Sequence, residues 1–216
     1  MTINWLPGFL FVWLVGTGSS CACAQDLPEL LKPPPKASVA LVLFQDLQSP
    51  LCASVFPAVN EAARSHNVPL VILDFPVPRH EWSFEAAVYD RYFTTQSQQL
   101  GEDFRGYILQ SQPRISDEPG LRRAAERFAA DHQVRVPQPI DPDGKLAFLV
   151  HQDFVLGQRV GVEITPTVFV VSSGNVSPAM VNAVERDRLN QEIAQALKKA
   201  KEMPGNSGSG SQTKRK

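Results

Sequence analysis

Residues 38–75 read SVALVLFQDLQSPLCASVFPAVNEAARSHNVPLVILDF, and this stretch decides the fold. It opens with the apolar run Ser38–Phe44 and closes with a second apolar run, Pro69–Phe75, and both are typical of buried strands. Between them, Ser49-Pro50 is a helix-start signal, because serine caps the first turn and proline has no N–H to leave unpaired. We expect this helix to run to about His66, with an interruption at Pro57. A strand, a helix and a strand with short links predict a βαβ unit with parallel strands.

The rest of the chain predicts a helical block followed by a helix, two strands and a final helix. Apolar residues recur at spacings of three and four through a segment of about residues 79–134, which indicates an inserted helical subdomain. We expect a helix over Lys145–Gly157, strands over Val168–Ser172 and Val176–Val181, and a closing amphipathic helix through Leu189. The helical stripes of the insertion are Trp82, Ala86, Tyr89 and Phe93, and then Leu121, Ala125, Phe128 and His132. The fold class is therefore α/β.

The beginning of the chain predicts export. Residues 1–24 hold no charged side chain, and an apolar core is followed by a small-x-small run at residues 22–24, which is typical of a signal-peptidase site. We therefore expect a signal peptide and a periplasmic or extracellular protein without a membrane span after cleavage. An uncleaved anchor, or a lipid anchor on Cys21 or Cys23, stays open. Cleavage leaves Cys52 alone in an oxidising compartment, without a partner for an internal disulfide.

Composition sets the domain limits and excludes several classes of function. Residues 25–37 are rich in proline and predict a tether, residues 38–203 form one domain, and the Gly/Ser-rich residues 204–216 predict a disordered tail. The 216 residues carry a net charge of -1, so we expect no nucleic-acid partner. The four histidines show no ligand spacing with cysteines or carboxylates, so we expect no metal, and no nucleotide motif indicates a cofactor.

The element order, and the residues at its joints, resemble the thioredoxin fold with a helical insertion, as in the DsbA-like disulfide oxidoreductases. Phe44–Cys52 looks like the strand end and the Cys-Pro-x-Cys active site of that family, and Pro57 stands where many members have a helix-kinking proline. Gly161–Thr167 is similar to the Gly-Val-x-x-Thr-Pro-Thr loop, whose proline is cis and faces the cysteines. The resemblance implies a central mixed sheet flanked by helices, and a substrate site at Pro50, Leu51, Thr165 and Pro166.

One departure from the family pattern concerns the chemistry. Ser49 stands where the family has its nucleophilic cysteine, and only the second cysteine, Cys52, remains. A serine hydroxyl does not form a mixed disulfide, so Ser49 keeps the helix N-cap role alone. Cys52 lies in the first helical turn, where unpaired N–H groups favour a thiolate, and is the candidate monothiol. Its interpretation as a small buried residue left from a redox ancestor stays open.

Two hypotheses of function follow. The first is an exported DsbA-like protein in thiol–disulfide chemistry, acting through Cys52 on an extended or unfolded polypeptide or on a small thiol such as glutathione. The second is a non-catalytic, chaperone-like module that holds a peptide or partner in the groove at Pro166. We expect His80 to cap or orient the inserted helices. The reactivity of Cys52 separates the two hypotheses.

Overall fold

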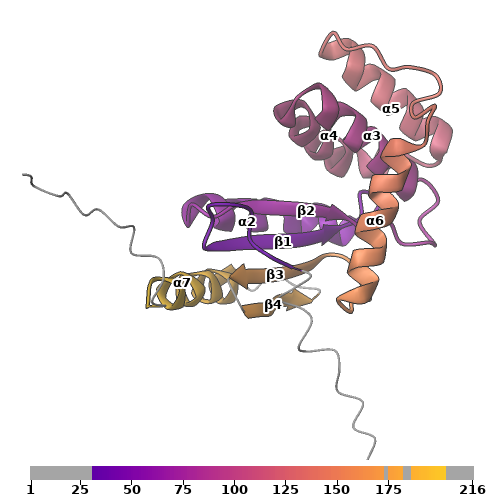
Figure 1. The fold of residues 1–216 in the computed structure, drawn as a ribbon. Helices are drawn as coiled ribbons and strands as arrows, with labels where there is room; N and C mark the ends of the chain where they lie inside the picture. Colours follow the sequence, from indigo (N-terminus) through magenta and orange to yellow (C-terminus); the bar gives the residue numbers. More distant parts are fainter. Residues whose placement is uncertain (1–30, 173–174, 182–185, 203–216) are drawn as a thin grey trace, which may run out of the picture.

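The computed structural model describes residues 31–172, 175–181 and 186–202, and it confirms the predicted α/β fold with a helical insertion (Figure 1). The elements run in the predicted order, and the insertion contains two long helices joined at Ser97 before its last helix. Their bounds are β1 Val39–Gln45, α2 Pro50–Ser65, β2 Leu70–Asp74, α3 Ser83–Gln96, α4 Gln98–Ser111, the 3-10 turn η1 Gln112–Arg114, α5 Glu118–Asp131, α6 Lys145–Arg159, β3 Thr167–Ser172, β4 Asn175–Val181 and α7 Arg186–Glu202. Within the described ranges, no helix is long and apolar enough to cross a bilayer.

The sheet is mixed, as predicted, with the strand order β2-β1-β3-β4. The strands β1 and β2 are parallel, with Leu41 opposite Leu70, and are connected through α2. The strand β3 runs antiparallel to both β1 and β4. The βαβ unit and the following antiparallel hairpin therefore meet at the centre of the sheet, and β2 and β4 lie at its edges.

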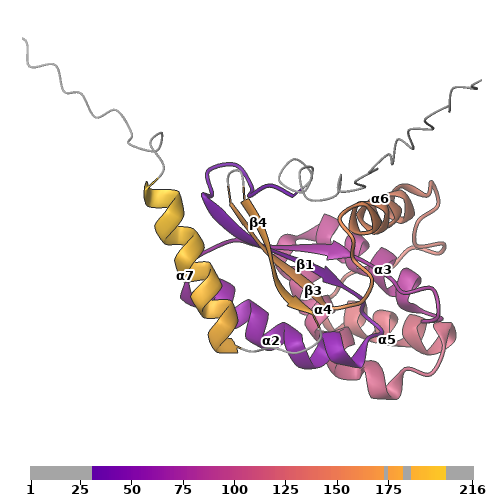
Figure 2. The ribbon, with the colours of Figure 1, turned by 90° about the horizontal axis from the view of Figure 1, so that it is seen from below.

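The central strand β1 buries both of its faces, because successive side chains point to opposite sides of a sheet. Val39, Leu41 and Leu43 belong to the cluster under α2 and α7. Val42 and Phe44 belong to the cluster on the opposite face, where α6 contributes its inner residues. The two layers of helices are visible in Figure 2, where α2 and α7 lie together on one side of the sheet and α6 lies on the other.

The helix α2 is continuous, although the sequence predicted an interruption at Pro57. Ser49 caps its N-terminus, and Pro50 occupies the first turn as predicted. Pro57 lies inside the helix and removes one backbone hydrogen bond, at a cost of about 3 kcal/mol. Val55, Val59 and two alanines are buried along the helix, and this packing against the sheet offsets the loss.

The insertion has its own apolar core between α3, α4 and α5. Phe93, Phe104 and Phe128 contact one another at ring-centroid distances between 4.5 and 5.2 Å. The helices α3 and α4 cross closely at Gly101, where a Cβ atom would lie 2.1 Å from Thr94 Oγ1, so only glycine permits this approach. Leu47 and Cys52 extend the same core, so the insertion packs directly against the loop that begins α2.

Candidate functional site

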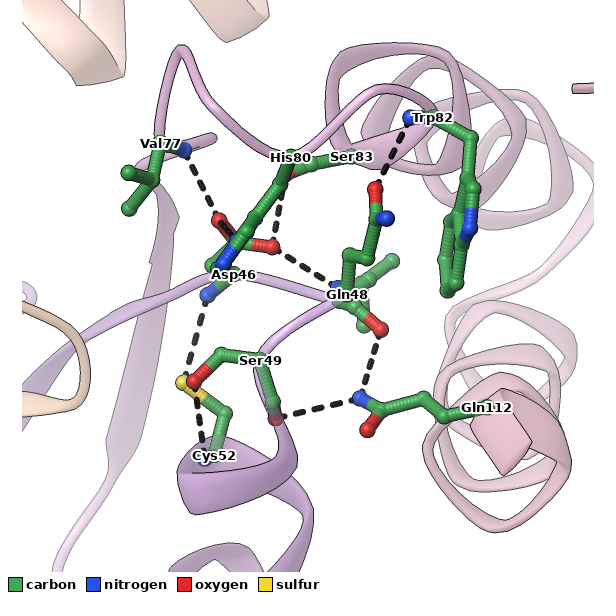
Figure 3. A network of polar contacts seen from close by, with 10 residues as sticks. Asp46, Gln48, Ser49, Cys52, Val77, His80, Trp82, Ser83 and Gln112 are labelled. Atoms are coloured by element: carbon green, nitrogen blue, oxygen red, sulfur yellow. Dashed lines mark hydrogen bonds and ion pairs between the residues drawn. The ribbon is translucent and has the colours of Figure 1, made fainter. Parts of the chain in front are cut away.

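The candidate site lies where β1 ends and α2 begins. The Ser49 side chain accepts a hydrogen bond from the Cys52 backbone N–H at 3.3 Å, which is the N-cap interaction that the sequence predicts. The Asp46 backbone N–H donates to Cys52 Sγ at 3.5 Å (Figure 3). The sulfur therefore lies at the N-terminal end of α2 and accepts a hydrogen bond from the preceding loop.

Burial controls the ionisation of the Cys52 thiol. Only 1% of the residue is exposed, and removal from water raises the thiol pKa from the ordinary value of 9.0. The Asp46 N–H and the side chains of Ser49 and Thr165 hydrogen-bond to the sulfur and lower the pKa, but by less than burial raises it. The negative charge of Asp46 adds to the increase. The thiol is therefore held in its protonated form at neutral pH.

The structure brings together four of the six residues that the sequence singled out. Ser49, Cys52, Thr165 and Pro166 are all buried, and the Thr165–Pro166 peptide bond is cis. Thr167 holds the turn of this loop, since its hydroxyl donates to the Ile164 carbonyl at 2.7 Å.

The other two residues of the predicted set are less buried. Pro50 is exposed, whereas Leu51 is half-buried and packs toward the cluster under α2 and α7. Leu51 is therefore partly a core residue.

The sequence interpretation missed the residue that organises this site, Asp46. Its side chain is 0% exposed and accepts four hydrogen bonds. Oδ1 accepts from the Gln48 N–H at 2.7 Å and from the Ser83 hydroxyl at 2.6 Å. Oδ2 accepts from the Val77 N–H at 2.8 Å and from His80 Nδ1 at 2.7 Å. Asp46 thus ties the loop before α2 to the segment between β2 and α3.

Two glutamines complete the connection between this loop and the insertion. Gln48 Oε1 accepts from the Trp82 N–H at 2.8 Å. Gln112 Nε2 donates to the Leu47 carbonyl at 2.7 Å and to the Ser49 carbonyl at 3.1 Å. Figure 3 shows these side chains around the loop, with Gln112 reaching it from η1, the turn after α4. The insertion therefore fixes the backbone that positions Cys52.

A signal for Asp46 was present in the sequence, because an acidic residue directly follows the buried strand and precedes the helix cap by three residues. Three of its four partners lie 31 to 37 residues further along the chain, and a local sequence pattern does not predict contacts at that separation. His80 lies one turn before α3, and its carbonyl accepts from the Ser83 N–H at 3.3 Å. The expected role of His80 in orienting the inserted helices agrees with this position.

No cluster of three or more metal-ligating side chains occurs in the part of the chain that the structure describes. The site presents the thiol of Cys52 at the start of α2, in contact with Thr165 of the cis-proline loop and with Ser49 at the helix cap.

Comparison with known proteins agrees with this geometry. The sequence model of the thioredoxin family matches residues 34–177, and no curated protein matches the chain. Among solved structures, the thiol-disulfide exchange protein alpha-DsbA2 of Wolbachia pipientis is 17% identical, with a TM-score of 0.61 over 76% of this chain and 84% of its own. A periplasmic thioredoxin-like protein of Salmonella enterica serovar Typhimurium is 18% identical, with a TM-score of 0.61 over 77% of this chain and 88% of its own.

A third solved structure has the same architecture. ScsC of Proteus mirabilis is 17% identical, with a TM-score of 0.60 over 77% of this chain and 71% of its own. At these identities the likeness shows the fold, including the insertion between β2 and the α6–β3 segment. The chain belongs to the thioredoxin family, and its fold is that of the DsbA-like members with a helical insertion.

Proposed function

We propose that this chain is an exported, DsbA-like protein that takes part in thiol–disulfide chemistry through the single thiol of Cys52. The observation that carries the proposal is the position of that thiol. Cys52 Sγ lies in the first turn of α2, accepts the Asp46 N–H, and is contacted by the side chains of Ser49 and Thr165. Hydrogen-bond donors around a sulfur stabilise its thiolate, which is the form that attacks disulfides.

The reaction is a single exchange. The Cys52 thiolate attacks one sulfur of a disulfide, forms a mixed disulfide with it and releases the other sulfur as a thiolate. The proton of Cys52 passes to solvent or to the released thiolate. Ser49 does not resolve the mixed disulfide, so an external thiol must attack it and regenerate Cys52. Glutathione disulfide and disulfide-bearing extended polypeptides are the substrate classes.

The burial of Cys52 sets the rate of this exchange. A protonated thiol with 1% exposure reacts only when the loop around it opens, so exchange is slow in the resting conformation. Opening must separate the loop at residues 46–49 from the insertion, because Gln112 and Trp82 hold it there. A polypeptide that binds near the cis-proline loop can open the loop at residues 46–49 in this way.

Several observations support export and the compartment. The charge-free segment of residues 1–24 is typical of a signal peptide. One structural neighbour is described as a periplasmic thioredoxin-like protein. A lone thiol in an oxidising compartment meets disulfides continually, which suits a monothiol protein.

The test is alkylation of the native protein by iodoacetamide between pH 7 and pH 10, with the Cys52→Ser variant as the control for other thiols. We expect labelling that is slow at pH 7 and rises about tenfold per pH unit up to the raised thiol pKa. Complete labelling in urea combined with none in the native protein at any pH overturns the proposal. In that case the buried thiol is structural, and the hypothesis of a non-catalytic binding module replaces the proposal of thiol–disulfide chemistry.

A further inference from the structure

The edge strand β2 leaves part of its backbone unpaired along one side. Among the described residues, β2 pairs only with β1. The Leu41 N–H donates to the Pro69 carbonyl, and the Phe75 N–H donates to the Gln45 carbonyl, so odd-numbered residues of this segment face β1. Leu70 and Ile72 therefore direct their backbone N–H and C=O groups away from the sheet.

The end of the same strand confirms this alternation. The Asp74 N–H points outward and donates to Asp153 Oδ2 of α6 at 2.9 Å. The outward groups of Leu70 and Ile72 have no such partner in the described part of the chain. An edge with free donors and acceptors is a template for the addition of another strand.

A cleft of about 730 Å³ lies along this edge, between β2 and α2 on one side and the insertion on the other. Its volume is within the range of ligand sites in proteins. Leu70 and Ile72 line it on the strand side. The other lining residues, from α2 and from the insertion, combine apolar and polar side chains, including Phe56, Asn60, Thr94, Gln98, Tyr107 and Phe128. This mixed lining suits an extended polypeptide better than a purely apolar ligand.

The whole lining of the cleft carries a small excess of negative charge, because its four carboxylates outnumber its three guanidinium groups; they are Asp90, Glu102, Asp103 and Asp131 against Arg64, Arg91 and Arg105. Arg91 Nε contacts Asp74 Oδ2 at 2.6 Å, and the same guanidinium also pairs with Asp153. Arg105 pairs with Asp90 Oδ2. Asp74 and Asp153, which do not line the cleft, thus balance the charge of Arg91. At the rim, Glu102, Asp103 and Asp131 outnumber the cation Arg64.

Asp90 is the residue that points to a specific ligand group. It lies on α3, lines the cleft and is only 1% exposed. Its Oδ2 is paired with Arg105, but its Oδ1 is buried and accepts no hydrogen bond from the described residues. An unpaired buried carboxylate oxygen is costly, and a donor that carries positive charge offsets this cost best.

From this arrangement we propose that the cleft along β2 is a second binding site, which takes an extended polypeptide segment by strand addition and a lysine or arginine side chain of that segment at Asp90. The backbone of the segment pairs with the outward groups of Leu70 and Ile72, which gives affinity without sequence preference. The basic side chain supplies the donor that Asp90 Oδ1 lacks, which gives specificity. The site lies apart from Cys52, does not involve its thiol and stands whether or not the proposed function holds.

The experiment measures binding of a fluorescent, threonine-rich eight-residue peptide with one central lysine to the full-length protein. The first comparison peptide has norleucine in place of lysine. Two more are N-methylated on alternate amides, one in each register. We expect the lysine peptide to bind, the norleucine peptide to bind at least tenfold more weakly, and one methylation register to abolish binding while the other retains it within twofold. The last result is specific to strand addition, where alternate amides face the sheet.

Variants locate the binding on the protein. Asp90→Asn removes the charge at similar volume and is expected to abolish the preference for lysine over norleucine. Asp187→Asn is the matched control, because Asp187 is exposed on α7 and does not line the cleft. It is expected to preserve that preference, as is Cys52→Ala.

Three results overturn the proposal: no binding of the lysine peptide, equal binding of the norleucine peptide, or equal tolerance of both methylation registers. The peptide comparisons need no variant, so the proposal stays testable if Asp90→Asn does not fold.

Discussion

Replacement of Asp46 by asparagine tests whether this carboxylate holds the loop before Cys52. The carboxylate accepts two hydrogen bonds on each oxygen, and one bond in each pair comes from a backbone N–H, that of Gln48 or that of Val77. Asparagine keeps one acceptor oxygen and places an NH2 group at the other position. His80 and Ser83 can each adapt to accept from that NH2 group, but a backbone N–H cannot. In either orientation of the amide, one buried N–H therefore faces another donor.

The expected cost follows from that count. One buried donor without a partner costs about 1–3 kcal/mol, and the loss of charge weakens the remaining hydrogen bonds by a further fraction. Asp46→Asn is therefore expected to lower the free energy of unfolding by about 1–4 kcal/mol, measured by urea denaturation. The control is Asp103→Asn, the same change at an exposed position of α4, which is expected to stay within about 0.5 kcal/mol of the wild type. An Asp46→Asn protein as stable as this control would refute the reasoning.

Three further predictions concern charge, redox chemistry and packing. Burial raises the pKa values of Asp90 and Asp153 to about 6. Between pH 6 and pH 4 the folded state therefore binds protons that the unfolded state does not bind. Urea denaturation is expected to show the free energy of unfolding rising by about 1–2 kcal/mol as the pH falls from 7 to 5. A fall in the free energy of unfolding over that interval would contradict the raised pKa values of these two buried carboxyl groups. Ser49→Cys adds a second thiol to the first turn of α2, and the variant is expected to reduce insulin, which is detected by turbidity. An inactive variant would mean that other features of the redox site are lost as well. Gly157→Ala places a Cβ 2.4 Å from a phenylalanine ring and is expected to cost about 1–3 kcal/mol, whereas Gly106→Ala meets open space and is expected to be neutral or stabilising in thermal unfolding.

The sequence was sufficient for the fold because each element carries a strong local signal. The β-branched run of β1 is buried on both faces, so its apolar pattern is continuous and unambiguous. Ser49 and Pro50 mark the start of α2 because the physics of a helix N-terminus is local. The interruption expected at Pro57 was wrong, since tertiary packing of the rest of the helix outweighs one missing hydrogen bond.

The candidate site was only partly accessible to such patterns. The pairing of Ser49 with Cys52 is a contact within one helical turn, and spacing alone predicts it. The bonds of Asp46 and Gln112 to distant segments depend on how the insertion packs, and no periodicity reports that. The burial of Cys52 is likewise a property of the assembled core, so its raised pKa could not be obtained from its position in the helix.

The most direct test of monothiol chemistry at Cys52 is an intact-mass measurement after incubation of the native, reduced protein with glutathione disulfide. The proposed exchange predicts a mass increase of one glutathionyl group, which reductant reverses and which the Cys52→Ser variant does not show. Formation of the adduct only in denaturant, with none in the folded protein after prolonged incubation, would contradict it.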